Sequence, residues 1–141
     1  GILSTVTATR NLDEDQLVEQ SRPRLEALVA EGVTTVEIKS GYGLTLKDEL
    51  KMLRAAKTLA RDYPLRLRRT LLAAHTVPPE YKNSPDRYVD LVCNEIIPQV
   101  ATEGLAEAVD VFCESIAFSL KQCEQIFNAA QKAELGIKVH A

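Results

Sequence analysis

The chain has 141 residues, with 17 Lys and Arg against 20 Asp and Glu, which gives a formal net charge of −3. This balance excludes a basic nucleic-acid grip, and a composition of 45% hydrophobic and 26% charged residues excludes a disordered chain. No apolar run approaches the roughly 18 residues of a membrane span, and the start Gly1–Ser4 has no signal-peptide pattern.

The first predicted elements are a helix, a strand and a glycine-rich turn. Apolar residues near helical spacing between positions 13 and 30 predict a helix that Pro23 kinks or divides and that Gly32 ends. The β-branched run 33–40 predicts a strand. The Gly-Tyr-Gly loop at 41–43 then ends this strand.

A second helix and a second strand follow the loop. Thr45 is a suitable N-cap for a helix that ends at Tyr63 and Pro64. The residues on its apolar face are Leu46, Leu50, Leu53, Ala56 and Ala60. Residues 65–74 predict a strand with His75 at its end.

Two further helices and two further strands complete the chain. A loop with adjacent prolines occupies 76–83, and Ser84 with Pro85 opens a helix that Pro98 should bend or end. Residues 108–113 predict the third strand. The capping box Ser119-Leu120-Lys121-Gln122 opens a helix that Gly136 is expected to stop, and 137–140 predict the fourth strand. The apolar face of this helix is expected to hold Leu120, Cys123, Ile126, Phe127 and Ala130.

This alternation predicts βαβ crossovers and a parallel sheet. The two architectures that fit are an open doubly wound sheet and part of a (β/α)8 barrel. A whole barrel needs roughly 250 residues, so four units correspond to about half of one. The chain starts without Met and ends on a strand, and we expect residues 1–141 to be a single segment, strands two to five, of a longer barrel.

Polar residues at the carboxyl ends of the strands are the candidate site, because both architectures bind ligands there. Both histidines of the chain, His75 and His140, are at this edge, as is Glu114, which could be a ligand, an acid-base group or a solvated loop carboxylate. The three cysteines show no C-x-x-C spacing and predict neither a disulfide framework nor a zinc ribbon, so a reducing cytoplasm is expected.

The Gly-Tyr-Gly loop has two interpretations. A glycine-rich turn between a strand and a helix could cradle a phosphate, but position 46 is Leu where the dinucleotide fingerprint needs a third glycine. Alternatively, the glycines permit a tight turn, and Tyr42 either caps the core or offers its hydroxyl to a substrate at the barrel mouth. The loop alone does not decide between the last two roles.

Several stretches together resemble the imidazolonepropionases, amidohydrolase-superfamily enzymes of histidine degradation. The matching segments are 33–44 with its Glu-Ile-Lys-Ser-Gly-Tyr-Gly block, 50–54, 74–82 with Ala-His-Thr-Val-Pro-Pro-Glu-Tyr, 88–93, 108–114 and 138–141. The resemblance implies a metal-dependent hydrolase of barrel fold that opens the ring of 4-imidazolone-5-propanoate to N-formimino-L-glutamate. It covers nearly the whole chain.

The resemblance also implies roles for three residues. Tyr42 would contact the substrate, and His75 would be a catalytic substrate contact that stabilises a developing oxyanion. His140 would bind a single Zn²⁺ or Fe ion, a role that suits a neutral imidazole. The family's His-x-His pair, its metal-binding aspartate and an acid or amide residue beyond the fifth strand have no counterpart here, so we expect this chain alone to be inactive and to hold no metal tightly.

Other functions stay open at this point. One is a related amidohydrolase or deaminase acting on a similar heterocycle, and another is a non-catalytic α/β module whose Gly-Tyr-Gly turn binds an anion. A third is a folding or assembly unit. Because an incomplete barrel exposes strand edges and apolar faces, we expect the chain to form a homo-oligomer. The expected substrate is a small molecule.

Overall fold

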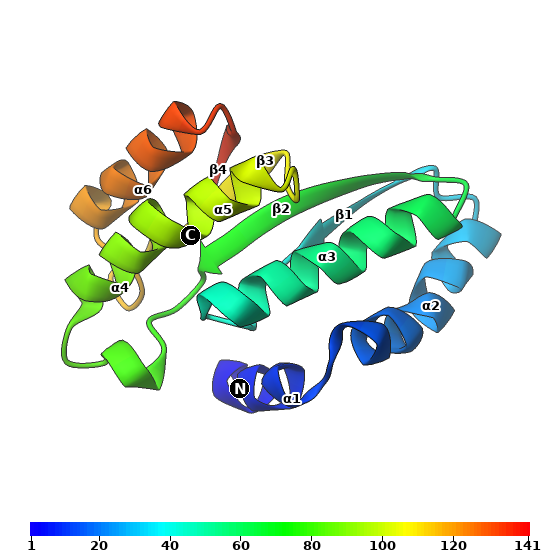
Figure 1. Cartoon of the computed structure of the whole chain (residues 1–141), viewed down its shortest axis with the longest axis horizontal. Helices are drawn as coiled ribbons and strands as arrows, with labels where there is room; N and C mark the ends of the chain where they lie inside the picture. The colour runs from blue at the N-terminus through cyan, green and yellow to red at the C-terminus, as the bar shows by residue number, and fades with distance from the viewer.

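The computed structural model describes residues 1–141 and contains one parallel sheet whose strands alternate with helices (Figure 1). The strands are β1 Thr35–Lys39, β2 Arg66–Ala74, β3 Ala108–Phe112 and β4 Gly136–His140. The helices are α1 Ile2–Asn11, α2 Glu14–Ala30, α3 Leu46–Asp62, α4 Pro85–Leu91, α5 Ile97–Thr102 and α6 Leu120–Lys132. The strands pair in the order β1-β2-β3-β4, and every neighbouring pair is parallel, which confirms the predicted fold class.

One face of the sheet is apolar and is covered by helices over β1 to β3, whereas Ile137 and Val139 of β4 stay exposed on it. The register places Val36 beside Leu67 and Leu71 beside Val109. The first pair packs against apolar residues of α2 and α3, and the second against those of α4, α5 and α6. A doubly wound sheet carries helices on both faces, whereas sequential strands with all crossovers on one face are the arrangement of a partial (β/α)8 barrel.

The other face of the sheet is polar, and we call it the polar face. Side chains alternate along a strand, so the residues between the apolar ones point to this side. Its members are Glu37, Lys39, Arg68, Thr70, Asp110, Phe112, Lys138 and His140. In a closed barrel this face would line the interior, with its carboxyl-terminal end at the mouth.

The helix starts follow the capping signals of the sequence. The Asp13 side chain accepts from the N–H of Gln16 at the start of α2, and Ser119 does the same for Gln122 at the start of α6. Thr45 accepts from the N–H of Asp48 and opens α3. Pro23 lies inside α2 and does not divide it. Side-chain capping therefore explains where three of the predicted helices begin.

The helix α1 was not predicted from the sequence. It buries only Val6 and Thr9, too few residues for a recognisable apolar stripe. Its last turn is held from outside, because the ammonium of Lys51 donates to the carbonyls of Thr9, Arg10 and Leu12. A tertiary contact thus stabilises the end of a helix that the local sequence does not predict.

Three details of the second half differ from expectation. Gly136 does not stop α6, which ends at Lys132, with Glu134 in the left-handed region at φ 58° and Gly136 already in β4. Leu120 is 81% exposed and does not join the apolar face of α6.

The third detail concerns Pro98, which does not end its helix. A π-helical turn, Val92–Ile96, precedes the proline, and the N–H of Ile97 bonds to Val92 five residues back. This wider turn relieves the chain of the bond that Pro98 cannot donate. The helix resumes as α5.

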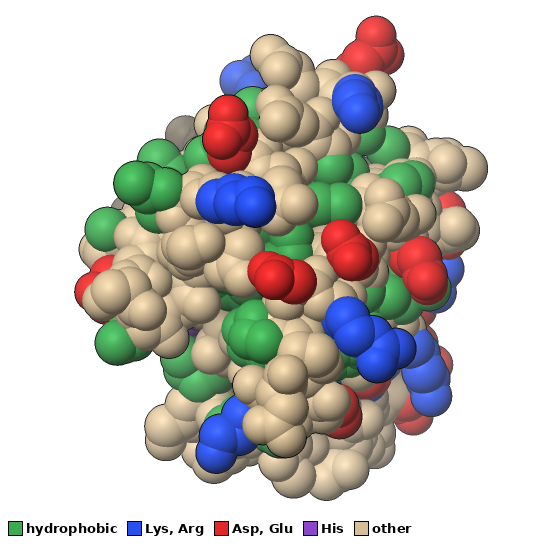
Figure 2. Space-filling model, turned by 90° about the vertical axis from the view of Figure 1, so that its left-hand side faces the viewer, with side chains coloured by type: hydrophobic (Ala, Val, Ile, Leu, Met, Phe, Trp, Pro, Cys, Tyr) green, Lys and Arg blue, Asp and Glu red, His purple; other side chains and the backbone are tan.

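None of the helices combines the length and the apolar character that crossing a bilayer requires. The surface over α4 and α6 mixes acidic, basic and apolar side chains and does not gather one sign of charge (Figure 2).

Candidate active site at the carboxyl ends of the strands

His140 ends β4 on the polar face and is held by Asp110 of β3. Its Nδ1 lies 3.1 and 3.0 Å from the two carboxylate oxygens of Asp110. An ionised carboxylate only accepts hydrogen bonds, so Nδ1 carries the hydrogen and donates. In the neutral ring, Nε2 therefore keeps its lone pair available on the side away from Asp110.

Asp110 is the buried anchor of this edge, with 1% of its side chain exposed. The ammonium of Lys39 on β1 donates to its Oδ2 at 2.7 Å. Burial acts to raise the pKa of Asp110, but the hydrogen bonds from Lys39 and His140 outweigh it and hold that pKa below the ordinary value. The hydrogen bond to Asp110 in turn raises the pKa of Lys39. Asp110 is therefore an anion at neutral pH.

His75 follows β2 and is held by backbone. Its Nδ1 lies 2.9 Å from the carbonyl oxygen of Gly41 in the loop after β1. A carbonyl oxygen has no hydrogen to give, so Nδ1 donates and Nε2 of the neutral ring is again the free acceptor. The two histidines share one tautomer but have different partners.

Aromatic rings connect the two histidines. The Tyr42 ring meets His75 edge to face at 5.1 Å between centroids, and His75 meets Phe112 in the same manner at 6.4 Å. Phe112 stacks on His140 at 5.1 Å with 11° between the planes. All three predicted site residues thus belong to one row along the carboxyl ends of the strands, with Phe112 between the histidines.

The N–H groups of the Gly-Tyr-Gly loop bind a carboxylate of the protein itself. Glu49, in the first turn of α3, is fully buried and accepts from the N–H groups of Gly41, Gly43 and Leu44 at 2.9 to 3.1 Å. Burial raises the pKa of Glu49, while donors including the Leu44 N–H and Ser40 act in the opposite direction. The N–H groups that an external anion would need are already bonded to Glu49, which argues against the anion-binding module.

The remainder of the polar face is an ion-pair ladder below the site. The ammonium of Lys138 pairs with the carboxylate of Glu37, which also accepts from the hydroxyl of Thr70 at 2.6 Å. The hydrogen bond from Lys138, followed by that from Thr70, lowers the pKa of Glu37. The ladder links β1, β2 and β4 through side chains as well as through backbone.

The residues present fit one position of a metal site. A histidine whose Nδ1 donates to a carboxylate, leaving Nε2 free, is the usual arrangement of a metal-binding imidazole, and Asp110 and His140 reproduce it. The chain gathers no group of three or more His, Cys, Asp or Glu side chains that could hold an ion.

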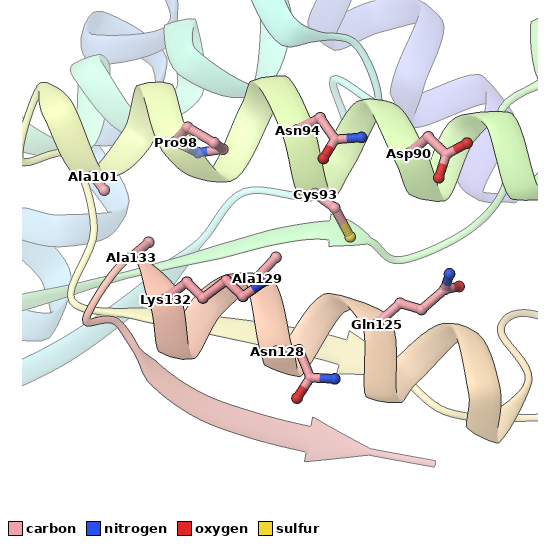
Figure 3. Close-up of a pocket in the computed structure, with 10 residues that line it drawn as sticks. All are labelled: Asp90, Cys93, Asn94, Pro98, Ala101, Gln125, Asn128, Ala129, Lys132 and Ala133. Carbon is pink, nitrogen blue, oxygen red and sulfur yellow. The ribbon is translucent and has the colours of Figure 1, made fainter.

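Two of the cysteines, Cys93 and Cys123, lie on helices and not in the row. Burial raises the pKa of Cys93 to about 11 and that of Cys123 to about 12, so neither is an available thiolate at neutral pH. Cys93 lines a surface groove of about 570 Å³ between the α4 to α5 segment and α6, together with amide side chains such as Asn94 and Asn128 (Figure 3). Glu114 is half-buried and accepts from the Ser115 hydroxyl at 3.3 Å.

Three contributors to this edge, Asp110, Phe112 and Glu49, were not singled out from the sequence. Asp110 has a visible signal, because it is the one charged residue within the apolar run 108–113. Glu49 has none, since an acidic residue in the first turn of a helix is common on the surface as well. Only the path of the Gly-Tyr-Gly loop around it makes it internal.

Proteins of one kind, the imidazolonepropionases, match this chain along its length. It is 62% identical over 141 residues to the imidazolonepropionase of Ectopseudomonas mendocina and 60% identical to that of Rhizorhabdus wittichii, in each case over 100% of this chain and 35% of the relative. The imidazolonepropionase of Aeromonas hydrophila is 60% identical over 140 residues. The chain therefore spans about a third of the length of the curated relatives it matches. No family model matches it.

Proposed function

We propose that this chain, a homologue of imidazolonepropionase along its whole length, forms strands two to five of a (β/α)8 hydrolase barrel. Its part of the active site would serve the opening of 4-imidazolone-5-propanoate to N-formimino-L-glutamate. The observation that carries the proposal is the pairing of His140 with the buried Asp110, which presents one free imidazole nitrogen at the carboxyl edge of the sheet.

His140 would hold the metal, Zn²⁺ or Fe, through Nε2. When bound, such an ion activates a water molecule and polarises the carbonyl that the water attacks. Asp110 fixes the orientation of the ring and keeps the hydrogen on Nδ1, and the net positive charge of Lys39 balances the buried carboxylate. The remaining ligands would come from the part of the barrel outside residues 1–141, and the inactivity of this chain alone stays a prediction.

His75 and Tyr42 would form the substrate side of the site. The neutral His75 ring already donates its only N–H to Gly41, so Nε2 can accept a hydrogen bond from a ring N–H of the substrate or take up a proton. Donation from His75 to an oxyanion requires the protonated ring. Tyr42 is half-buried against His75, and its hydroxyl is a donor that needs no protonation step.

The homo-oligomeric state and the cytoplasmic location stay predictions. The small-molecule substrate is part of the proposal itself.

A chimera tests the proposal. Residues 1–141 replace the matching third of the Ectopseudomonas mendocina relative, and formation of N-formimino-L-glutamate is followed by mass spectrometry with the unmodified relative as reference. The proposal expects the chimera to open the ring and the His75→Ala chimera to lose that activity while keeping its metal. A folded, metal-loaded chimera that leaves 4-imidazolone-5-propanoate intact would contradict it.

A further inference from the structure

Glu49 is an internal carboxyl group that the proposed function does not use. No part of it is exposed, and its hydrogen-bond partners are three backbone N–H groups of one loop. Oε1 accepts from the N–H groups of Gly43 and Leu44 at 3.0 and 2.9 Å, and both oxygens accept from the N–H of Gly41 at 3.1 Å. A buried acidic group surrounded by donors alone is suited to fix the backbone around it.

The loop is shaped to reach this carboxylate. Gly41 has φ 111°, and a Cβ there would lie 3.0 Å from the carbonyl oxygen of Leu72 and 3.1 Å from Nδ1 of His75. At Gly43 a Cβ would lie 2.6 Å from backbone atoms of Asp48 and Glu49. Both glycines are thus needed for the close approach of the loop to β2 and α3.

One hydrogen-bonded path leads from Glu49 to His75. Gly41 donates its N–H to Glu49 and accepts Nδ1–H of His75 on its carbonyl. The hydroxyl of Ser40, the residue before Gly41, accepts the N–H of Leu72 at 3.0 Å and ties the start of the same loop to β2. The carbonyl that orients the His75 ring is therefore tied to the Glu49 carboxylate through the Gly41 backbone.

We propose that Glu49 is a positioning residue that sets the tautomer and the orientation of His75 through the Gly41 carbonyl, and holds Tyr42 against that ring. Its consequence for catalysis rests on the function proposed above, but its effect on His75 does not. The N–H groups of the Gly-Tyr-Gly loop form an anion-binding nest, and the anion they bind is the Glu49 carboxylate of the same chain. The loop therefore shapes the substrate wall and binds no phosphate.

The test compares Glu49→Gln with Thr45→Ala in the 141-residue chain. Glutamine keeps the size of the side chain but turns one acceptor into a donor that faces the N–H of Gly41. Thr45→Ala removes the N-cap bond of the same helix and leaves the nest intact. Long-range ¹H–¹⁵N spectra of histidine-labelled chain, recorded above the ordinary imidazole pKa of about 6.5, show which nitrogen of His75 carries the hydrogen. A His140→Ala sample assigns the two rings.

The wild-type chain and Thr45→Ala are expected to show His75 hydrogenated at Nδ1, and Glu49→Gln to show a mixture of both tautomers. In the chimera, Glu49→Gln is expected to lower kcat by about 10- to 100-fold, as loss of an orienting contact does, without loss of metal. A wild-type His75 hydrogenated at Nε2 would overturn the proposal even if Glu49→Gln fails to fold. So would an unchanged tautomer in folded Glu49→Gln. An inactive chimera with the expected tautomers would refute the proposed function and leave the positioning role standing.

Discussion

His75 and His140 lie at the same edge of the sheet and present the same free nitrogen, but their anchors differ in kind. His75 is held by the carbonyl of Gly41, a fixed dipole on a loop, at 2.9 Å. His140 is held by the Asp110 carboxylate, a buried full charge on a neighbouring strand, at 3.0 Å. A carboxylate partner strengthens an imidazole as a ligand for a cation, whereas a carbonyl partner orients a neutral ring that exchanges hydrogen bonds or protons.

The difference shows how one sheet edge could serve the two roles proposed for it. In the proposed site the metal side would rely on the charges of Lys39 and Asp110, and the substrate side on the loop geometry that we propose Glu49 to set. Changes to charged side chains should therefore affect metal binding first, and changes to the loop should affect His75 first. Four predictions test this division.

The largest effect is expected from Asp110→Asn. The variant loses the negative charge between Lys39 and His140. Its amide has one acceptor oxygen, whereas the carboxylate of Asp110 has two. We expect the chimera to bind its metal about 10- to 100-fold more weakly, and the chain to lose about 1–3 kcal/mol of stability in urea unfolding. Asp90→Asn, an exposed carboxylate on α4, is the matched control and should change neither value. Metal affinity equal to that of the wild type would show that Asp110 does not orient the ligand.

The loop side is expected to be most sensitive at Gly43. In Gly43→Ala the added carbon meets backbone at 2.6 Å, so the loop or the first turn of α3 has to move. We expect a loss of about 1–3 kcal/mol, as for an overpacked core position, with metal affinity in the chimera unchanged. Gly104→Ala, which has open space around it, is the comparison variant and should cost about 1 kcal/mol for its left-handed backbone. Equal losses in the two variants would show that the loop has room to adjust.

A smaller effect is expected from Lys39→Met, which keeps the aliphatic stem and removes the ammonium. Asp110 then keeps only His140 as a charged or polar side-chain partner, and its pKa should rise toward the ordinary value, because burial is no longer offset by Lys39. Carboxyl ¹³C titration measures that rise. We expect a loss of about 0.5–1.5 kcal/mol. A pKa that stays depressed would assign the stabilisation of the anion to His140 alone.

The smallest effect is expected in the loss of stability at low pH. The folded pKa of Glu37 is below its ordinary value of 4.5, since Lys138 and Thr70 donate to the carboxylate. The stability it contributes is therefore complete above pH 4.5 and is lost as the pH falls through the folded pKa. Urea unfolding at several pH values should show a shallower acid decline for Glu37→Gln than for wild type. If the free energy of unfolding falls equally with pH in both proteins, the pair of Glu37 and Lys138 contributes no measurable stability.

The sequence predicts the strands and most helices because their signals are local. Thr45 and Ser119 mark helix starts, and short runs of β-branched and apolar residues mark the strands. The sequence missed the helix α1, because this helix depends on a contact with Lys51 from another helix. The predicted end of α6 was wrong because the chain turns at Glu134, a residue type that rarely adopts the left-handed conformation, and not at Gly136.

The same distinction applies to the site. Tyr42, His75 and His140 are found from strand ends and from the family resemblance, and the structure brings them into one row with Phe112. The side chain of Glu49 carries no sign of its burial in the sequence. Its partners are the backbone N–H groups of a loop, which no residue pattern displays.

Metal analysis of two matched chimeras tests the central division most directly. His140→Gln and His75→Gln are each purified with the same metal, and bound Zn²⁺ and Fe are counted per protein. Our account predicts that His140→Gln loses the ion, whereas His75→Gln retains it and loses ring opening. Full metal content in His140→Gln, or loss of metal in His75→Gln alone, would contradict it.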